Sequence, residues 1–233
     1  MKAGKYVAIS ILSVLIVVIL AGLAFDSGRG GGFSATGPEM PRLRQVLNLK
    51  PGVSVADVGA GGGDLTLALA AEVAPGGRVF SSDIDPNALD EIRGRVAAAG
   101  VHNVTVIQAG AGTTGLPVNC CDAIVLRRVY HHLSDPGATN ADFLRSMRPG
   151  AVLAVIDFPP TLAWLWPWPP PGVPKNRNGH GVRADAVVGE VTASGFELVQ
   201  LFDDWPGRGP LGSYCAVFRK AAVAALEDPH VAR

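Results

Sequence analysis

The stretch that decides the fold is Val55-Ala56-Asp57-Val58-Gly59-Ala60-Gly61-Gly62-Gly63-Asp64. Its apolar start predicts a buried strand, and an Ala/Leu-rich helical pattern begins at Asp64, directly after the glycines. Glycine permits positive φ and lets a ligand lie against bare backbone. The first turn of a helix offers unpaired N–H groups. The stretch therefore predicts a strand–loop–helix unit with a ligand at the loop.

A dinucleotide-binding fingerprint, G-x-G-x-x-G/A, fits this loop poorly. Counted from Gly59, its last position requires Gly or Ala, and this chain has Asp64 there. The fingerprint also has no need of an acid inside the strand, where Asp57 stands. The loop therefore argues against an NAD(P)-dependent oxidoreductase, which stays a weaker alternative.

A carboxylate follows the next predicted strand, about 20 residues after the loop. Asp83 ends the run Val79-Phe80-Ser81-Ser82, shortly before a predicted helix with Pro86 near its first turn. A carboxylate in this place can accept hydrogen bonds from both hydroxyls of a ribose. Asp85 is the alternative ribose ligand. Turn and helix-cap roles for both acids are the simpler interpretation that competes with ribose binding.

Short apolar runs alternate with helical patterns from about residue 38 onward. The expected strands are Val53–Val58, Arg78–Ser82, Val104–Gln108, Ala123–Leu126, Ala151–Asp157, Phe196–Phe202 and Tyr214–Phe218. The expected helices are Asp64–Val73, Pro86–Ala99, Asn140–Met147 and Arg183–Ala193. This alternation predicts an α/β fold with a mostly parallel sheet and helices on both faces.

The pattern Asp57-x-Gly59-x-Gly61-x-Gly63 resembles the first motif of the class I S-adenosylmethionine (SAM) methyltransferases. The segment Leu116–Leu126, in which an acid precedes an apolar run, is similar to the fourth-strand segment of that family. Arg148–Leu153 is similar to the turn into its fifth strand. The resemblance covers about residues 41–220. It implies SAM as cofactor and a Rossmann-like class I methyltransferase fold, with a seven-stranded, mostly parallel sheet in the strand order 3-2-1-4-5-7-6.

The resemblance also implies which residues bind the cofactor. Asp57 and the glycines shape the loop, and Asp83 binds the ribose. This chain departs from the family between residues 106 and 116, where an acid or amide near the adenine is usual and no carboxylate stands here. The backbone, Gln108 or Ala109 is expected at the adenine instead, and a weakened affinity for SAM is the equal alternative. The full expected set is Asp57, Gly59, Ala60, Gly61, Gly63, Asp83, Ile84, Gln108 and Ala109.

Tyr130, His131 and His132 directly follow the fourth strand. Ligands of such folds bind at the carboxyl ends of the strands, so these three residues fall where a base or a group that orients the acceptor is needed. We expect them to be catalytic, His131 before the others, and we expect Asp157 in the substrate pocket. A metal site formed by these histidines with His180 and Asp157 is conceivable, but it matches no ligand motif, and we expect no metal.

The segment Pro159–Pro174 (PPTLAWLWPWPPPGVP) holds three of the four tryptophans, Trp164, Trp166 and Trp168. Its position in the family makes it the loop over the substrate pocket, so Trp164 and Trp166 are expected pocket residues. Tryptophan suits an apolar–water boundary. This allows contact with a bilayer or an amphipathic substrate, and a hydrophobic lid packed on its own domain is the slightly favoured interpretation.

Tyr6–Phe25 is an uncharged apolar run of 20 residues, about 30 Å long as a helix, which matches a bilayer core. We expect a single-pass transmembrane anchor over residues 1–25, with a cleaved signal segment and export as the alternative. A Gly/Ser-rich linker (26–37), the methyltransferase domain (38–220) and a tail (221–233) follow. The membrane side stays open, because SAM is cytosolic while Lys2 and Lys5 favour export.

The composition excludes two classes of protein. The chain of 233 residues is 48% hydrophobic, and its 20 basic residues equal its 20 acidic ones. Disorder is excluded as the main state, and no cationic excess exists to bind nucleic acid. The three cysteines form no disulfide framework and show no metal-ligand spacing. We expect transfer of a methyl group from SAM to a small or lipid-like molecule. A non-catalytic SAM-binding membrane protein is the alternative, and the oligomeric state stays open.

Overall fold

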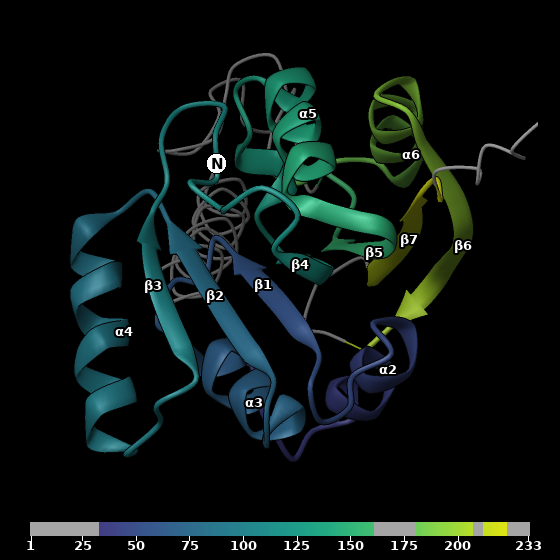
Figure 1. Ribbon diagram of the computed structural model, residues 1–233. Coiled ribbons are helices and arrows are strands. Elements are labelled where there is room, and N and C mark those ends of the chain that lie inside the picture. The colour runs from purple at the N-terminus through teal and green to yellow at the C-terminus, as the bar shows by residue number, and fades with distance from the viewer. Residues whose placement is uncertain (1–32, 161–179, 207–211, 223–233) are drawn as a thin grey trace, which may run out of the picture. The chain divides into compact units, whose positions relative to one another are not determined.

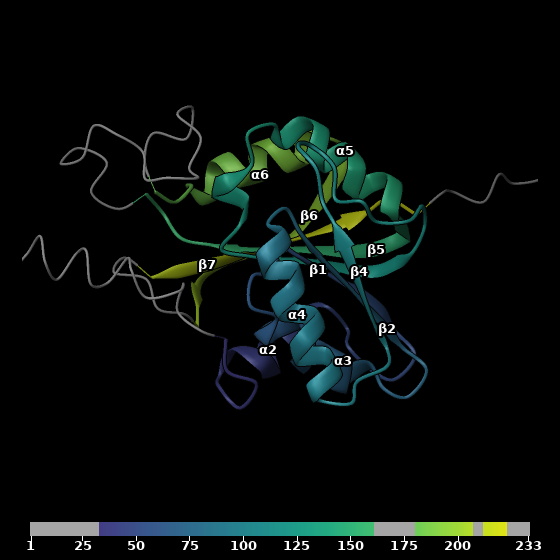
Figure 2. The same ribbon diagram turned by 90° about the vertical axis from the view of Figure 1, so that its left-hand side faces the viewer.

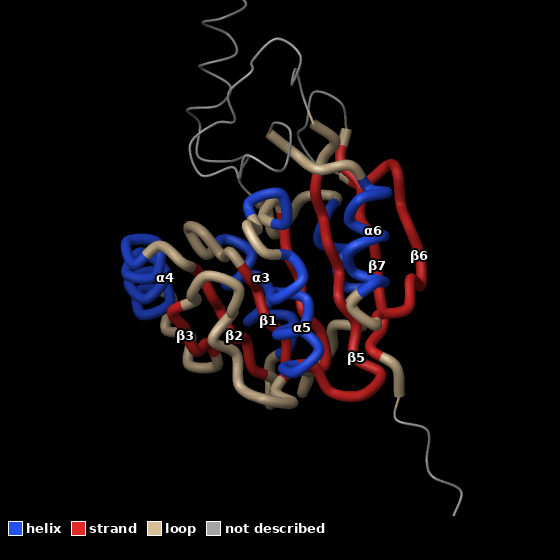
Figure 3. Tube along the Cα trace, turned by 90° about the horizontal axis from the view of Figure 1, so that it is seen from above, coloured by secondary structure: helices blue, strands red, loops and turns tan. Residues whose placement is uncertain are grey.

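The computed structural model describes residues 33–160, 180–206 and 212–222 of the chain. Its seven strands form one sheet in the order β3-β2-β1-β4-β5-β7-β6, which the labels of Figure 1 follow from left to right. Figure 3 shows the same sheet from above, with β3 and β6 at its two edges. Strands β1 to β5 run parallel, and β7 pairs antiparallel with β5 and with β6. The Rossmann-like fold and the strand order expected from the sequence are confirmed.

The bounds of the elements agree closely with the sequence pattern. The strands are β1 (Ser54–Val58), β2 (Arg78–Asp83), β3 (Val104–Gln108), β4 (Cys121–Arg127), β5 (Met147–Asp157), β6 (Phe196–Trp205) and β7 (Ser213–Lys220). The helices are α2 (Glu39–Val46), α3 (Asp64–Val73), α4 (Pro86–Ala98), α5 (Pro136–Ser146) and α6 (Ala184–Ala193), with a 3₁₀ turn η1 (Tyr130–His132).

Helices cover both faces of the sheet (Figures 1 and 2). In Figure 2, α5 and α6 lie on one face, and α2, α3 and α4 lie on the other. Helices therefore shield both faces of the central strands from solvent. In β4, Ala123, Ile124, Val125 and Leu126 are all fully buried. A strand that is covered on both faces needs a continuous apolar run rather than an alternating one. This explains why β4 is readable in the sequence.

Two predicted boundaries were wrong, because local hydrogen bonds extend the elements. Helix α5 begins at Pro136 rather than Asn140, since the Asp135 carboxylate caps it by accepting a hydrogen bond from the Ala138 N–H at 2.9 Å. Strand β5 begins at Met147, which pairs with Cys121 ahead of the predicted turn. Helix α2 was not predicted at all.

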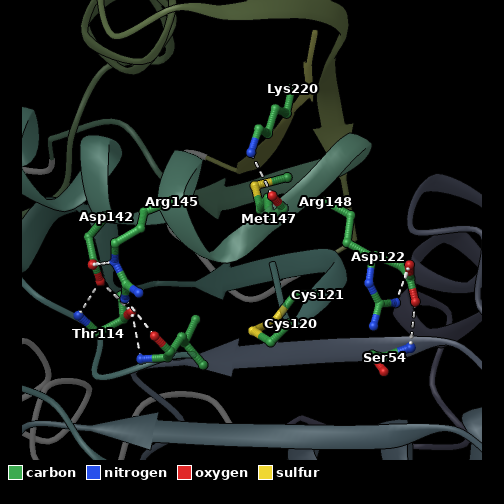
Figure 4. Close-up of a disulfide and its surroundings, with 11 residues drawn as sticks. Ser54, Thr114, Cys120, Cys121, Asp122, Asp142, Arg145, Met147, Arg148 and Lys220 are labelled. Carbon is green, nitrogen blue, oxygen red and sulfur yellow. Dashed lines mark hydrogen bonds and ion pairs between the residues drawn. A yellow bond between two sulfur atoms is a disulfide. The ribbon is translucent and has the colours of Figure 1, made fainter. Parts of the chain in front are cut away.

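Cys120 and Cys121 are joined by a disulfide between neighbouring residues, at the amino end of β4 (Figure 4). The sequence predicted no disulfide framework, and nothing in it indicated this single bond between neighbours. Beside it, the Asp122 carboxylate accepts from the Ser54 N–H at 2.9 Å and pairs with Arg148 at 2.6 Å. This region lies at the opposite end of β4 from the three residues of η1, so the disulfide takes no part in the site described below.

No helix in the described ranges is both long and apolar enough to cross a membrane. The predicted anchor at residues 1–25 lies outside those ranges, as do Trp164, Trp166 and Trp168 and most of the predicted tail. The anchor and the tryptophan-rich pocket loop therefore stay predictions.

Candidate active site

The glycine loop between β1 and α3 has one closed side and one open side. Gly59, Gly61 and Gly63 have φ values of +71°, +52° and +79°, which side-chain-bearing residues rarely adopt. A Cβ atom at Gly59 would lie 2.4 Å from Cγ2 of Val129, whereas one at Gly61 would meet nothing within 4 Å. Gly61 is therefore the point at which the loop presents open backbone to a ligand.

Asp83 reaches the loop from the end of β2. Its Oδ2 accepts a hydrogen bond from the Gly61 N–H at 2.8 Å, and its Oδ1 accepts one from the Asp85 N–H at 2.9 Å. The Asp85 carboxylate instead caps α4 by accepting from the Asn87 N–H at 2.9 Å. The structure thus separates the two acids: Asp85 is a helix cap, and Asp83 lies at the open glycine with lone pairs left for a ribose.

Asp57 lies beneath the loop. Its side chain is buried, and its Oδ2 accepts a hydrogen bond from Thr66 Oγ1 of α3 at 2.7 Å. Burial raises the pKa of Asp57 to about 6, while the Thr66 hydrogen bond and the charge of Arg127 oppose the rise. These contacts tie β1 to α3, so Asp57 shapes the loop from below. No pattern in the sequence pointed to Thr66 as its partner.

The residues expected at the adenine form a small surface beside Asp83. Ile84 is 64% exposed, which is unusual for a large apolar side chain. Gln108 Nε2 donates to the carbonyl of Ile84 at 2.9 Å, and the Ala109 N–H donates to the carbonyl of Asp83 at 2.9 Å. Apolar surface next to convergent polar groups is what a purine ring and its ribose require.

Asp64, the residue that conflicts with a dinucleotide fingerprint, has a structural partner. Arg95 of α4 donates to its carboxylate and to the carbonyl of Gly62. The ion pair holds the end of the loop and the start of α3 against α4. An acid at this position therefore stabilises the loop.

A buried pair lies at the carboxyl ends of β4 and β5. Nδ1 of His131 is 2.8 Å from Oδ1 of Asp157, and the two side chains are 1% and 0% exposed. The Asp157 carboxylate also accepts from the backbone N–H groups of His131 and Phe158. Because Asp157 is the acceptor for all these groups, Nδ1 of His131 carries the ring proton. Its Nε2 is buried and has no hydrogen-bond partner within the described residues.

The other residues expected to be catalytic separate into two groups. The rings of His132 and His180 lie beside that of His131, with centroids 4.1 and 4.9 Å away. Tyr130 points elsewhere: it is fully buried in the core, and its hydroxyl accepts a hydrogen bond from Asn140 of α5. The expectation of a catalytic Tyr130 is therefore corrected to a positioning role, since its ring fixes η1 against α5.

Val129 connects the cofactor loop to the histidines. Its side chain occupies the space next to Gly59, and His131 follows two residues later. Sequence reasoning missed Val129, because a single apolar residue after a strand carries no signal of its contact.

A hollow of about 420 Å³ opens beyond the end of β5 and is lined, among others, by Pro159, Arg183 and Tyr214.

Comparison with known proteins identifies the domain that holds this geometry. Residues 55–150 match the family described as a methyltransferase domain. The chain is 33% identical over 110 residues to the ubiquinone/menaquinone biosynthesis C-methyltransferase of Shewanella halifaxensis, covering 47% of this chain and 44% of that protein. It is 34% identical over 104 residues to the demethylmenaquinone methyltransferase of Symbiobacterium thermophilum, covering 44% and 41%. The chain thus spans less than half the length of these relatives.

A solved structure extends the likeness of the fold. A SAM-dependent methyltransferase from Aquifex aeolicus superposes with a TM-score of 0.63 at 21% identity, covering 82% of this chain and 100% of that one. The matched segment contains the open Gly61 backbone, the Asp83 carboxylate and the His131 ring. Residues 55–150 are therefore similar to a methyltransferase domain, and the fold around them is that of the Aquifex aeolicus structure.

Proposed function

We propose that this protein transfers the methyl group of SAM to a small, lipid-like molecule. The observation that carries the proposal is the meeting of Gly61 and Asp83, which places open backbone and a carboxylate at one point beside the exposed Ile84. Bound SAM supplies a methyl group on a sulfonium, and its transfer is an in-line displacement. The protein's contribution is therefore to hold the acceptor atom in line with that methyl group.

The acceptor side supports a small molecule with one polar end. Val129 brings the pair of His131 and Asp157 next to the cofactor loop, and Phe158 adds an aromatic ring 5.0 Å from the His131 ring. We propose that His131 and His132 orient the acceptor and that Asp157 fixes His131. The relatives named as quinone methyltransferases make an apolar ring compound with a hydroxyl group the first acceptor class to test.

Titration of the full chain in detergent with SAM tests the cofactor part. Asp83→Asn should weaken SAM binding by about 10- to 100-fold, because a hydrogen bond to a charged group contributes roughly 1.5–3 kcal/mol. Asp90→Asn is the matched control, since Asp90 is an exposed residue of α4 paired with Arg93, and such pairs contribute little. Equal affinity in wild type and Asp83→Asn would remove the ribose assignment.

A methyl-transfer screen on reduced demethylmenaquinone and simpler phenols tests the reaction. Methylated product that depends on SAM is the expected result. SAM binding with no product across the screen favours the non-catalytic SAM-binding protein. Binding of NADH without binding of SAM would overturn the proposal in favour of an oxidoreductase.

We also propose that residues 6–25 anchor the protein in a membrane, since their uncharged length suits a bilayer. Trp164, Trp166 and Trp168 would then meet an amphipathic substrate at the membrane surface. A C-terminal reporter that is active only outside the cytoplasm decides the side. Recovery of the full chain in the soluble fraction without detergent would contradict the anchor.

A further inference from the structure

Three histidines from two separate segments gather at the carboxyl end of β4. His131 and His132 belong to η1, and His180 comes from the segment before α6. One ring nitrogen from each lies within 4.8 Å of the other two. Imidazole nitrogens are common metal ligands, so three of them in one place suggest a metal site.

The most buried of the three has an unsatisfied nitrogen. His131 is 1% exposed, and its Nε2 has no hydrogen-bond partner within the described residues. The Phe158 ring, whose centroid is 5.0 Å from that of His131, carries no N–H or O–H group that could donate to Nε2. A buried acceptor without a hydrogen-bond partner costs free energy. A cation bound at Nε2 removes that cost.

The other nitrogen of the same ring has the partner that metal-binding histidines usually have. Nδ1 of His131 donates to the Asp157 carboxylate at 2.8 Å, and such a carboxylate fixes the tautomer and raises the basicity of the ligand nitrogen. Asp157 is fully buried, so a carboxylate there would offset part of the positive charge of a divalent ion bound at the His131 ring.

We propose that His131, His132 and His180 bind one transition-metal ion of the Zn²⁺ type at the acceptor side of the site. Neutral imidazoles suit zinc, copper, iron and nickel rather than magnesium or calcium. A tetrahedral zinc site with Zn–N bonds of 2.0–2.1 Å needs nitrogens about 3.4 Å apart. His132 is exposed and His180 is half-buried, so rotation of these two side chains closes the set around His131.

Three protein ligands leave the fourth tetrahedral position open, which is the arrangement of catalytic rather than structural zinc sites. The open position would bind the oxygen of a deprotonated acceptor and hold it as an anion. That role rests on the proposed methyl transfer, whereas binding of the metal ion itself does not.

The test uses the full chain in detergent, purified without a polyhistidine tag, stripped with a chelator and titrated with Zn²⁺ against a chromophoric competitor. We expect one Zn²⁺ per chain. His180→Gln and His132→Gln should each weaken Zn²⁺ binding by at least about 10-fold, and Asp157→Asn by about 10- to 100-fold. His102→Gln is the matched control, because His102 is exposed and outside the cluster, and it should bind Zn²⁺ as the wild type does.

Co²⁺ provides a second readout that does not depend on activity. The wild-type protein loaded with Co²⁺ should show the intense visible absorption of a four-coordinate ion, and His180→Gln should lose it. Wild-type affinity for Zn²⁺ in both His180→Gln and His132→Gln would overturn the proposal, as would no binding by the wild type. SAM titration of the same samples separates the two proposals, since a protein that binds SAM but no Zn²⁺ refutes only the metal site.

Discussion

The cofactor side of the site uses backbone groups from one short segment, whereas the acceptor side uses side chains from three segments. Residues 59–63 leave open space at Gly61, and Asp83 is the side chain that accepts from the Gly61 N–H. On the acceptor side, His131, Asp157 and His180 follow different elements of the chain. A backbone site can be encoded locally by glycine, but a side-chain site exists only once the sheet has formed.

The two sides also differ in how their buried acids are satisfied. Asp57 beneath the loop accepts from the side-chain hydroxyl of one neighbouring helix residue, Thr66. Asp157 accepts from an imidazole and from two backbone N–H groups. Removing an acid should therefore damage the acceptor side more than the cofactor side, and the variants below test that difference.

Asp157→Ala should give the largest loss of stability. It leaves three N–H donors buried without an acceptor, and breaking such a buried pair costs about 3–5 kcal/mol. Urea denaturation of the metal-free protein measures the loss. Asp185→Ala is the control, because this exposed acid pairs with exposed Arg183 and its removal should change the free energy of unfolding by less than about 0.5 kcal/mol.

Asp157→Ala also tests whether the cofactor side and the acceptor side of the site act separately. If they do, folded Asp157→Ala protein should bind SAM with nearly wild-type affinity, because Gly61 and Asp83 keep their contact. A drop in SAM affinity of more than about tenfold, or 1.4 kcal/mol, would show that the cofactor side depends on the acceptor side.

Gly59→Ala should have the next largest effect, and it probes the contact that joins the sides. The new Cβ lies 2.4 Å from Val129 at a φ of +71°, so steric overlap and left-handed strain together cost about 2–4 kcal/mol. The double variant Gly59→Ala/Val129→Ala should regain the steric part and keep the strain. Equal instability of the single and double variants would contradict this contact.

Gly61→Ala is the matched comparison in the same loop. Its φ is +52° and nothing lies within 4 Å of the new Cβ, so the loss of stability should be about 1–2 kcal/mol. SAM affinity should fall more than stability does, because the methyl group covers the open backbone. Thermal unfolding with and without SAM measures both effects in one experiment.

The sequence predicted the strand, loop and helix of the cofactor side well because their information is local, while the ribose role of Asp83 stays a prediction. The spacing of Asp57, the glycines and Asp83 predicts a strand, a loop and a ribose ligand without any knowledge of packing. The sheet order came from resemblance to a family, not from the residues alone. Strands β4 and β5 were readable because burial on both faces demands long apolar runs, here residues 123–126 and 151–156.

The acceptor side was predicted as a list of residues but not as an arrangement. Tyr130 and His131 are adjacent in the sequence, yet one enters the core toward Asn140 and the other pairs with Asp157. A 3₁₀ turn sends neighbouring side chains in different directions, and no pattern in the sequence specifies which. His180 lies about 50 residues further along the chain, so its approach to His131 depends entirely on the fold.

The smallest expected effect concerns Asp57 and the response of the cofactor side to pH. Burial raises the pKa of this carboxyl from 3.8 to about 6 in the folded protein. Between these values the unfolded chain has released the proton while the folded chain keeps it, so a rise in pH favours unfolding. The contribution of Asp57 to stability is therefore greatest below about pH 4, falls as the pH rises, and is constant above about pH 7.

Asp57→Asn removes this titration and keeps an oxygen that accepts from Thr66. Relative to this variant, the wild type should lose about 1–2 kcal/mol of stability between pH 5 and pH 7.5, which urea denaturation across that range can measure. Thr66→Val sharpens the test: the Thr66 hydrogen bond lowers the pKa of Asp57, so its removal should extend the loss to higher pH. If the free energies of unfolding of wild type and Asp57→Asn differed by the same amount at every pH, Asp57 would stay charged beneath the loop. The two buried acids, Asp57 and Asp157, would then differ only in the hydrogen bonds that they accept.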